Sequence, residues 1–236
     1  IRDRISTNLA EKIAMTVTEA PYRVTAETIS NTCGQTISSS GVWNMMQRLG
    51  ERIDEEEQYA VKEMHADRAQ GEKVIPVLFE EMDGIWLHMQ NSNHRKMKKQ
   101  EMKVFTMYEG WDKEQKKRSS LVEKTMLAGM ESSQIFHEKR EALIEKKYNA
   151  DEIQQRILNG DGGSWIRETY DTDAIFQLDR YHIYQEILRK ISDRDAQREA
   201  RKLFEEEKIT EFLEFILVYA DSVETTDEKD KRSQKA

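Results

Sequence analysis

The feature that most restricts the fold of this chain is a change in the spacing of its apolar residues near residue 70. Before that point, apolar residues recur three or four positions apart, as in LAEKIAMTV, and this spacing is typical of amphipathic helices. After it come short apolar runs of β type, first KVIPVLFEE and GIWLHMQ, then EMKVFTMYEG and SLVEKTMLAG. The first part is therefore expected to be helical and the next part to form strands.

The second half of the chain alternates between these two patterns. SSQIFHEKREALIEKKY predicts a helix, QRILNG and AIFQLD predict strands, and helical spacing continues after Tyr181. Strands in succession followed by strand–helix alternation indicate an α/β protein with a mixed sheet and flanking helices. We therefore expect four regions, which are helices over residues 1–70, a sheet core over 71–192, further helices over 193–220, and a polar, disordered tail over 221–236.

Composition narrows the class of protein. Charged residues make up 35% of the 236 residues and the net charge is −8, which argues against an overall basic nucleic-acid coat but leaves local basic patches open. The single cysteine, Cys33, excludes an internal disulfide framework and fits a reducing cytoplasm. Because no apolar run approaches the roughly 18 residues of a membrane span, we expect a cytoplasmic protein without a membrane partner.

One aspartate is enclosed by glycines in the segment RILNGDGGSWIRE. Asp161 follows an apolar run, with Gly160 before it and Gly162 and Gly163 after it. Ligand sites in α/β sheets lie beyond the carboxyl ends of strands, and glycine there permits a sharp turn or the close approach of a ligand. Asp161 is therefore a candidate site residue, although a plain loop or a helix N-cap explains the same letters.

A second aspartate has the same setting. Asp83 ends the apolar run VLFEEMD and precedes Gly84, although Asp-Gly by itself is more often a hairpin turn. Two carboxylates at adjacent strand ends are suited to share Mg²⁺ or Mn²⁺, since Mg²⁺ is typically held by one or two carboxylates plus phosphate oxygens. Two such ions about 3.5–4 Å apart activate a water and stabilise the leaving oxygen of an in-line displacement.

Four segments, in this order and spacing, resemble the ISLre group of bacterial insertion-sequence transposases: LFEEMDGIWLHMQ, EMKVFTMYEGW, RILNGDGGSWI and LDRYHIYQEI. The segment YRVTAETISNTCGQTISSSGVWNMMQRLGE is similar to the part that precedes the catalytic core in that group. The resemblance covers the chain up to about residue 190. It implies a ribonuclease H-like core of the DDE type, in which two aspartates and a distal glutamate bind Mg²⁺ and cut and join DNA strands.

The resemblance assigns roles to individual residues. Asp83 matches the first aspartate of the group and Asp161 the second. LDRYH resembles the Asp/Cys-x-x-His element of the related Mutator-like transposases, which implies that Asp179 and His182 lie near the site. For His182 alone, a histidine satisfied at the start of a helix is an equally good interpretation.

No glutamate stands in a context that resembles the third acid of the group. FEEEKITEFLEF is interpreted as one amphipathic helix whose acids form its solvated face. Its expected apolar face consists of Leu203, Phe204, Phe212, Leu213, Ile216 and Leu217, and the available acids are Glu205, Glu206, Glu207, Glu211 and Glu214. We therefore expect the chain to stop inside a helical insertion, to bind Mg²⁺ or Mn²⁺ weakly, and to cut DNA poorly by itself.

Two segments suggest contact with double-stranded DNA. HRKMKKQ is a basic loop between two predicted strands, suited to neutralise phosphates, although a solvated hairpin tip explains it as well. Its cations are Arg95, Lys96, Lys98 and Lys99. VTAETISNTCGQTISSSGVWNMMQ has helix–turn–helix spacing with Gly34 in the turn, a pattern that any small helical bundle also gives.

In the helix–turn–helix interpretation, the second helix presents one face to DNA and the other to the core. The residues placed to reach base edges are Ser39, Ser40, Asn44 and Gln47, and Arg48 is placed to reach a phosphate. Val42, Trp43 and Met46 are expected on the core side, and Cys33 is expected to be a small buried residue.

Three functions stay open on the sequence. The first is a Mg²⁺-dependent DDE transposase that cleaves a phosphodiester at the element's end and joins the freed 3′-hydroxyl to target DNA, acting as a homo-oligomer when complete and associated with the nucleoid. The second is a non-catalytic DNA-binding or regulatory remnant of such an element. The third, weaker one is an unrelated metal-dependent nuclease or phosphatase.

Overall fold

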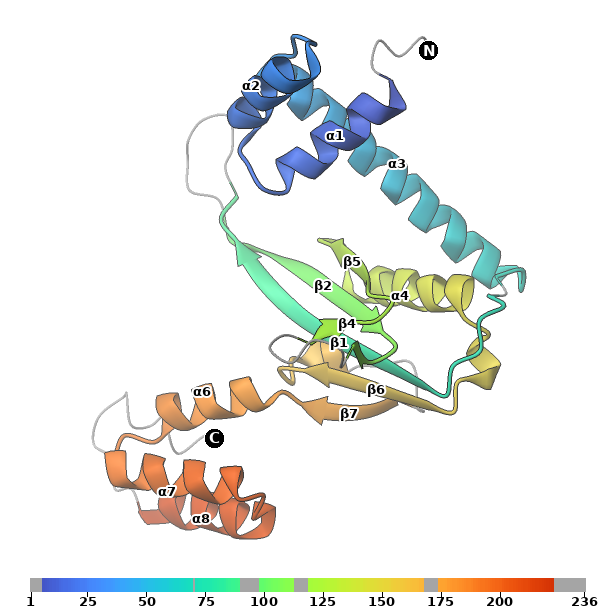
Figure 1. Cartoon of the computed structure of the whole chain (residues 1–236). Helices are drawn as coiled ribbons and strands as arrows, with labels where there is room; N and C mark the ends of the chain where they lie inside the picture. The colour runs from blue at the N-terminus through green and yellow to red at the C-terminus, as the bar shows by residue number, and fades with distance from the viewer. Residues whose placement is uncertain (1–5, 70, 90–97, 113–118, 168–173, 223–236) are drawn as a thin grey trace. The chain divides into compact units, whose positions relative to one another are not determined.

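The computed structural model describes residues 6–69, 71–89, 98–112, 119–167 and 174–222 (Figure 1). The chain divides into two compact units, one formed by Ile1–Lys73 with Glu138–Ala150 and the other by Val74–His137 with Asp151–Ala236. Arg95, Lys96 and most of the predicted polar tail lie outside the described residues. No helix in the described ranges has the length and apolar character needed to cross a membrane.

The first unit begins with the predicted helices. They are α1 (Thr7–Val17), α2 (Tyr22–Cys33) and α3 (Ser39–His65). Gly34 ends α2 in the left-handed conformation with φ of 63°, and the Ser38 side chain caps α3 by accepting the Gly41 N–H. The helices pack around Ile13, Ala26, Ile29 and Val42, which confirms the helical N-terminal region and places Val42 in its core.

One expected core residue of α3 is on the surface. The Trp43 side chain is 48% exposed, so its assignment to the core side was wrong, while Met46 is half-buried. Val42 already fills the space that faces Ile13 and Ile29, and the next position along a helix points about 100° away. Cys33 is half-buried rather than buried and packs against the same cluster.

The second half of α4 (Ser133–Lys147) also belongs to the first unit. Lys139 Nζ lies 2.8 Å from Asp54 Oδ1 and 2.9 Å from Glu57 Oε2, both on α3. This cation holds the pKa of the Asp54 carboxyl below its usual range through the hydrogen bond and its charge. The Gly71 N–H donates to the Glu145 carbonyl at 2.7 Å, so the chain after α3 is fixed to α4.

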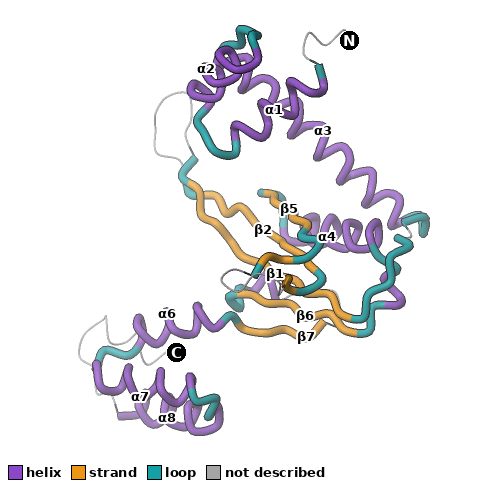
Figure 2. The backbone as a smooth tube through the Cα atoms, viewed as in Figure 1, coloured by secondary structure: helices purple, strands orange, loops and turns teal. Residues whose placement is uncertain are grey.

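The second unit is built on a five-stranded sheet in the order β5-β2-β1-β6-β7 (Figure 2). Its strands are β1 (Val77–Leu87), β2 (Gln100–Tyr108), β5 (Thr125–Gly129), β6 (Gln155–Gly160) and β7 (Ala174–Leu178). β2 is antiparallel to β1 and β5, whereas β1, β6 and β7 are parallel. The predicted mixed α/β sheet is confirmed, and a short β3–β4 hairpin (Trp111–Asp112 and Ser120–Leu121) accompanies it.

The prediction of two separate strands around Asp83 was wrong. β1 runs without interruption through Asp83 and Gly84, because its pairing with β2 continues from Phe79↔Tyr108 to Leu87↔Gln100. Gly84 therefore does not turn the chain, and Asp83 lies within a strand rather than at its end. The parallel pairing of β1 with β6 nevertheless stops at Met82, the residue just before Asp83.

A buried ion pair joins β1 to β6 on the face of the sheet opposite to Asp83. The Glu80 side chain is fully buried, and Arg156 donates to it from Nε at 2.6 Å and from Nη2 at 3.1 Å. Such a two-pronged contact fixes the position of β6 along β1. The two strands that lead to the candidate aspartates are thus aligned by a specific buried contact.

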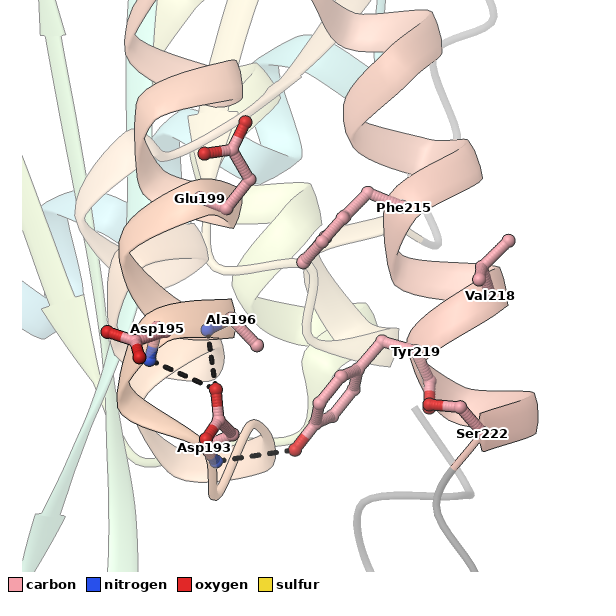
Figure 3. Close-up of a pocket in the computed structure, with 8 residues that line it drawn as sticks. All are labelled: Asp193, Asp195, Ala196, Glu199, Phe215, Val218, Tyr219 and Ser222. Carbon is pink, nitrogen blue, oxygen red and sulfur yellow. Dashed lines mark hydrogen bonds between the residues drawn. The ribbon is translucent and has the colours of Figure 1, made fainter.

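Between β7 and Ser222, the last described residue, the chain forms the helices α6 (Arg180–Lys190), α7 (Arg194–Glu205) and α8 (Ile209–Ser222). The predicted single helix FEEEKITEFLEF was wrong, because α7 ends at Glu205 and Glu207 adopts φ of 58°. Two residues of its expected apolar face, Leu213 and Leu217, are 55% and 67% exposed. Figure 3 shows Tyr219 of α8 directed at the start of α7, where its hydroxyl accepts the Asp193 N–H at 3.4 Å.

Candidate functional site

The site lies where three parallel strands reach the same level. In the sheet register Met82 of β1 is opposite Gly160 of β6, and Gly160 is opposite Leu178 of β7. The residue that follows each of them is an aspartate, and these are Asp83, Asp161 and Asp179. The register therefore places three carboxylates side by side at the carboxyl edge of the parallel strands, where α/β sheets carry their ligand sites.

Three of the side chains at this edge form a cluster with the geometry of a metal centre. Asp83, Asp161 and His182 each offer a ligand atom, and these atoms lie within 4.8 Å of one another. Both aspartates are exposed and His182 is half-buried. Two carboxylates and an imidazole with open positions for water suit a divalent cation such as Mg²⁺ or Mn²⁺, with the histidine favouring Mn²⁺.

Asp179 is the N-cap of α6 and His182 lies in its first turn, and both line the cavity that contains Asp83 and Asp161. Asp179 caps the helix by accepting the Tyr181 N–H at 3.1 Å, and its other oxygen lies 2.9 Å from His182 Nδ1. A carboxylate on one ring nitrogen leaves the other nitrogen available and fixes the ring orientation, as in many histidine metal ligands. These contacts satisfy the capping interpretation, and they leave the site interpretation open as a prediction.

The glycines around Asp161 have separate structural reasons. Gly162 adopts φ of +83°, which turns the chain directly after β6. The Gly163 N–H donates to Asp161 Oδ1 at 2.8 Å and so fixes that carboxylate. A Cβ on Gly160 would stand 2.8 Å from Ile166 Cγ2, which means that the short helix α5 (Ser164–Arg167) packs directly on the end of the strand.

Trp165 holds the loop that carries Asp161. Its indole Nε1–H donates to Glu101 Oε1 of β2 at 3.1 Å, and its carbonyl oxygen lies 2.7 Å from His137 Nε2. The Phe136 ring meets the indole edge-on at a centroid distance of 5.9 Å. The sequence did not indicate this anchoring, because Glu101 and His137 approach Trp165 only through the tertiary fold.

We expect Gly162→Ala to lower the free energy of unfolding by about 1–2 kcal/mol, since a Cβ is disfavoured at positive φ. The added Cβ would also lie 3.2 Å from Leu178 Cδ1. Gly50→Ala is the matched control, because it lies within helix α3 with open space around a Cβ and is expected to be neutral or stabilising. Urea unfolding measures the stability of both variants. Equal midpoints for the two would contradict the requirement for glycine at position 162.

The residues predicted to contact DNA are all at the surface where the structure describes them. Ser39, Ser40, Asn44, Gln47 and Arg48 of α3 are exposed, as are Lys98 and Lys99 directly before β2. They belong to different units, and their roles stay predictions.

Comparison with known proteins places the chain in a family. A family model described as an uncharacterised protein family, UPF0236, matches residues 1–236. The chain belongs to UPF0236. No curated protein matches it.

Asp83, Asp161 and His182 of this UPF0236 chain line a cavity of about 510 Å³. Sequence reasoning missed two of its charged residues, Glu81 and Arg180. Glu81 lies two positions before Asp83, so strand alternation places both on one face, and this signal was available in the sequence. Arg180 directly follows Asp179, and its guanidinium stacks 5.0 Å from the centre of the Phe204 ring.

Glu81 is held by the hydroxyl of Tyr108, which donates to Glu81 Oε1 at 2.9 Å. Tyr108 is 1% exposed, and its burial together with this hydrogen bond raises the pKa of its phenol. The tyrosine therefore remains a proton donor, and one oxygen of Glu81 is fixed toward β2.

Proposed function

We propose that this UPF0236 chain carries the catalytic centre of a Mg²⁺-dependent DDE-type DNA transposase with a ribonuclease H-like core. The observation that supports this most is the approach of Asp83, Asp161 and His182 to within 4.8 Å. The mixed sheet, with Asp83 on β1 and Asp161 directly after the adjacent strand β6, agrees with the core that the resemblance to ISLre-group transposases implies. The double-stranded DNA partner and a nucleoid location belong to the same proposal.

In this mechanism the carboxylates of Asp83 and Asp161 would hold the ion, and His182, whose ring Asp179 orients, would offer a nitrogen ligand. Bound Mg²⁺ or Mn²⁺ supplies Lewis acidity toward the scissile phosphate. Gly163 and Gly84 donate backbone N–H groups to Asp161 and Asp83 at 2.8 and 2.7 Å, so both carboxylates are positioned before substrate arrives. Side-chain acid–base chemistry has a small part.

Arg180 supports a phosphate substrate at this cavity. It lines the same space as Asp83 and Asp161, and its nearest described acid is Glu207, with Nη1 3.6 Å from Oε1. This ion pair is exposed on both sides, so a phosphate competes with it at little cost. Stacking on Phe204 keeps the guanidinium near the cavity.

Nicking of supercoiled plasmid DNA in Mn²⁺ tests the proposed reaction. We expect slow nicking by the wild-type chain that is lost in Asp83→Asn and in Asp161→Asn, with an unchanged rate in Asp151→Asn, an exposed aspartate outside the cluster. Nicking that persists in both site variants contradicts the assignment. DNA binding without any nicking favours the alternative, a DNA-binding or regulatory protein that lacks the chemistry.

We expect the surface cations to set the salt dependence of DNA binding. Replacing Arg48, or the group Arg95, Lys96, Lys98 and Lys99, by glutamine should weaken duplex binding and flatten its dependence on salt, by roughly one unit of slope per lost phosphate contact. Lys124→Gln, an exposed lysine outside both segments, is the control. Fluorescence anisotropy across a salt series measures the slope of the binding constant against salt concentration. Slopes equal to that of the wild type would mean that these cations are solvated surface residues without a role in DNA binding.

A further inference from the structure

A row of polar side chains crosses the sheet one step below the metal centre. In the register Glu81 is opposite Thr106 on one side and Asn159 on the other, and Asn159 is opposite Gln177. Directly paired residues project to the same face, so this polar row (Thr106, Glu81, Asn159 and Gln177) spans the four strands β2, β1, β6 and β7. All four residues line the cavity that contains Asp83 and Asp161.

Three of the four side chains in this polar row make no hydrogen bond to the described part of the protein. Thr106 is 8% exposed, and its hydroxyl makes no hydrogen bond within the part of the chain that the structure describes. The same holds among those residues for the half-buried side chain of Asn159 and for Gln177. Asn159 is half-buried, and Glu81 and Gln177 are exposed, so the hydrogen-bonding groups of the polar row face the cavity and are available to a ligand that enters it.

The chemistry of the polar row selects the ligand. It contains no cation, and the Glu81 carboxylate would repel a phosphate placed on it. A deoxyribose offers too few polar groups for four partners. A nucleobase fits, because asparagine and glutamine amides pair with an adenine edge and a carboxylate accepts from an exocyclic amino group such as that of cytosine.

We propose that the polar row is a subsite for an unpaired nucleobase bearing an amino group, adenine or cytosine, adjacent to the phosphate that a cation on Asp83 and Asp161 would bind. This inference rests on the proposed function for the position of that phosphate. The cavity of about 510 Å³ is in the size range of small-molecule pockets and accommodates a nucleotide. Tyr108 orients Glu81 for this contact, since it ties one carboxylate oxygen and leaves the other for the base.

Fluorescence anisotropy with labelled single-stranded dodecamers tests the subsite in Ca²⁺ buffer. The probes are oligo-dA, oligo-dC, oligo-dT and an abasic strand of the same length. We expect the wild-type chain to bind oligo-dA or oligo-dC about tenfold more tightly than oligo-dT and the abasic strand. Asn159→Ala and Gln177→Ala should each remove most of this preference, while Gln154→Ala, an exposed amide just before β6, should retain it.

Gln177 is exposed on the outermost strand of the described sheet, so its replacement leaves folding intact and keeps the test decisive. Mn²⁺ binding by the same proteins separates the two proposals. Equal affinity of a Mn²⁺-binding wild-type chain for all four strands overturns the nucleobase subsite and leaves the proposed function standing. A base preference in a chain that binds no Mn²⁺ supports the subsite and overturns the metal centre.

Discussion

Replacement of Asp161 by asparagine is expected to lower the affinity of the chain for Mn²⁺ by about a hundredfold or more. Loss of a partner that only supports a ligand typically costs 10–100-fold, and the loss of a ligand charge costs at least as much. The amide oxygen of asparagine can still accept the Gly163 N–H, so the turn after β6 survives the change. Titration of free Mn²⁺ by electron paramagnetic resonance measures the dissociation constant directly.

Asp83→Asn is expected to have an effect of the same size, because both carboxylates contribute one ligand atom to the same cluster. Asp179→Asn should cost less, about tenfold, since Asp179 acts through its contact with His182 Nδ1. The control is Asp151→Asn, which is exposed and outside the cluster. A wild-type affinity for Mn²⁺ in both Asp83→Asn and Asp161→Asn would refute the metal centre.

Replacement of Glu80 by alanine is expected to lower the free energy of unfolding by about 3–5 kcal/mol. The change leaves the Arg156 guanidinium, whose side chain is only 13% exposed, without its two-pronged carboxylate partner on β1. Removing one member of a buried ion pair is costly, because the remaining charge stays desolvated. Urea unfolding followed by tryptophan fluorescence measures the difference.

The matched control is Glu186→Ala, which removes a surface carboxylate paired with Arg189 at 2.9 Å. Both of those side chains are largely exposed, so a loss of no more than about 1 kcal/mol is expected. If Glu80→Ala were as mild as Glu186→Ala, the alignment of β1 with β6 would have to rest on other contacts. The double variant Glu80→Leu with Arg156→Met should recover much of the loss, since a well-packed apolar pair leaves no desolvated guanidinium that has lost its carboxylate.

The parts of the fold that sequence predicted well are governed by local patterns. QRILNG coincides with β6, and Asp161 does follow its last residue, because an apolar run bounded by glycine encodes both the strand and its end. The helix predicted over SSQIFHEKREALIEKKY is α4. The approach of Asp83 to Asp161 was also expected, since two aspartates followed two strands that were predicted to be neighbours.

The features that sequence could not predict depend on pairing between distant segments. Asp83-Gly84 has the letters of a turn, yet β2 pairs on both sides of it and keeps the strand extended. The break between α7 and α8 at Glu207 could not be predicted, because the segment contains no glycine or proline that would indicate the end of a helix. Asp83, Asp161 and Asp179 lie side by side because the residues before them are paired in the parallel register of β1, β6 and β7. No local sequence pattern specifies this register.

The most direct test of the metal centre is a pulsed electron paramagnetic resonance measurement of Mn²⁺ bound to the wild-type chain. We expect nitrogen modulation from one imidazole ligand, because His182 offers a ring atom within 4.8 Å of the ligand oxygens of Asp83 and Asp161. The modulation should disappear in His182→Gln and persist in His137→Gln, whose ring contacts the Trp165 carbonyl away from the cluster. Bound Mn²⁺ without nitrogen modulation, or with modulation that survives His182→Gln, would rule out His182 as a ligand of the proposed metal centre.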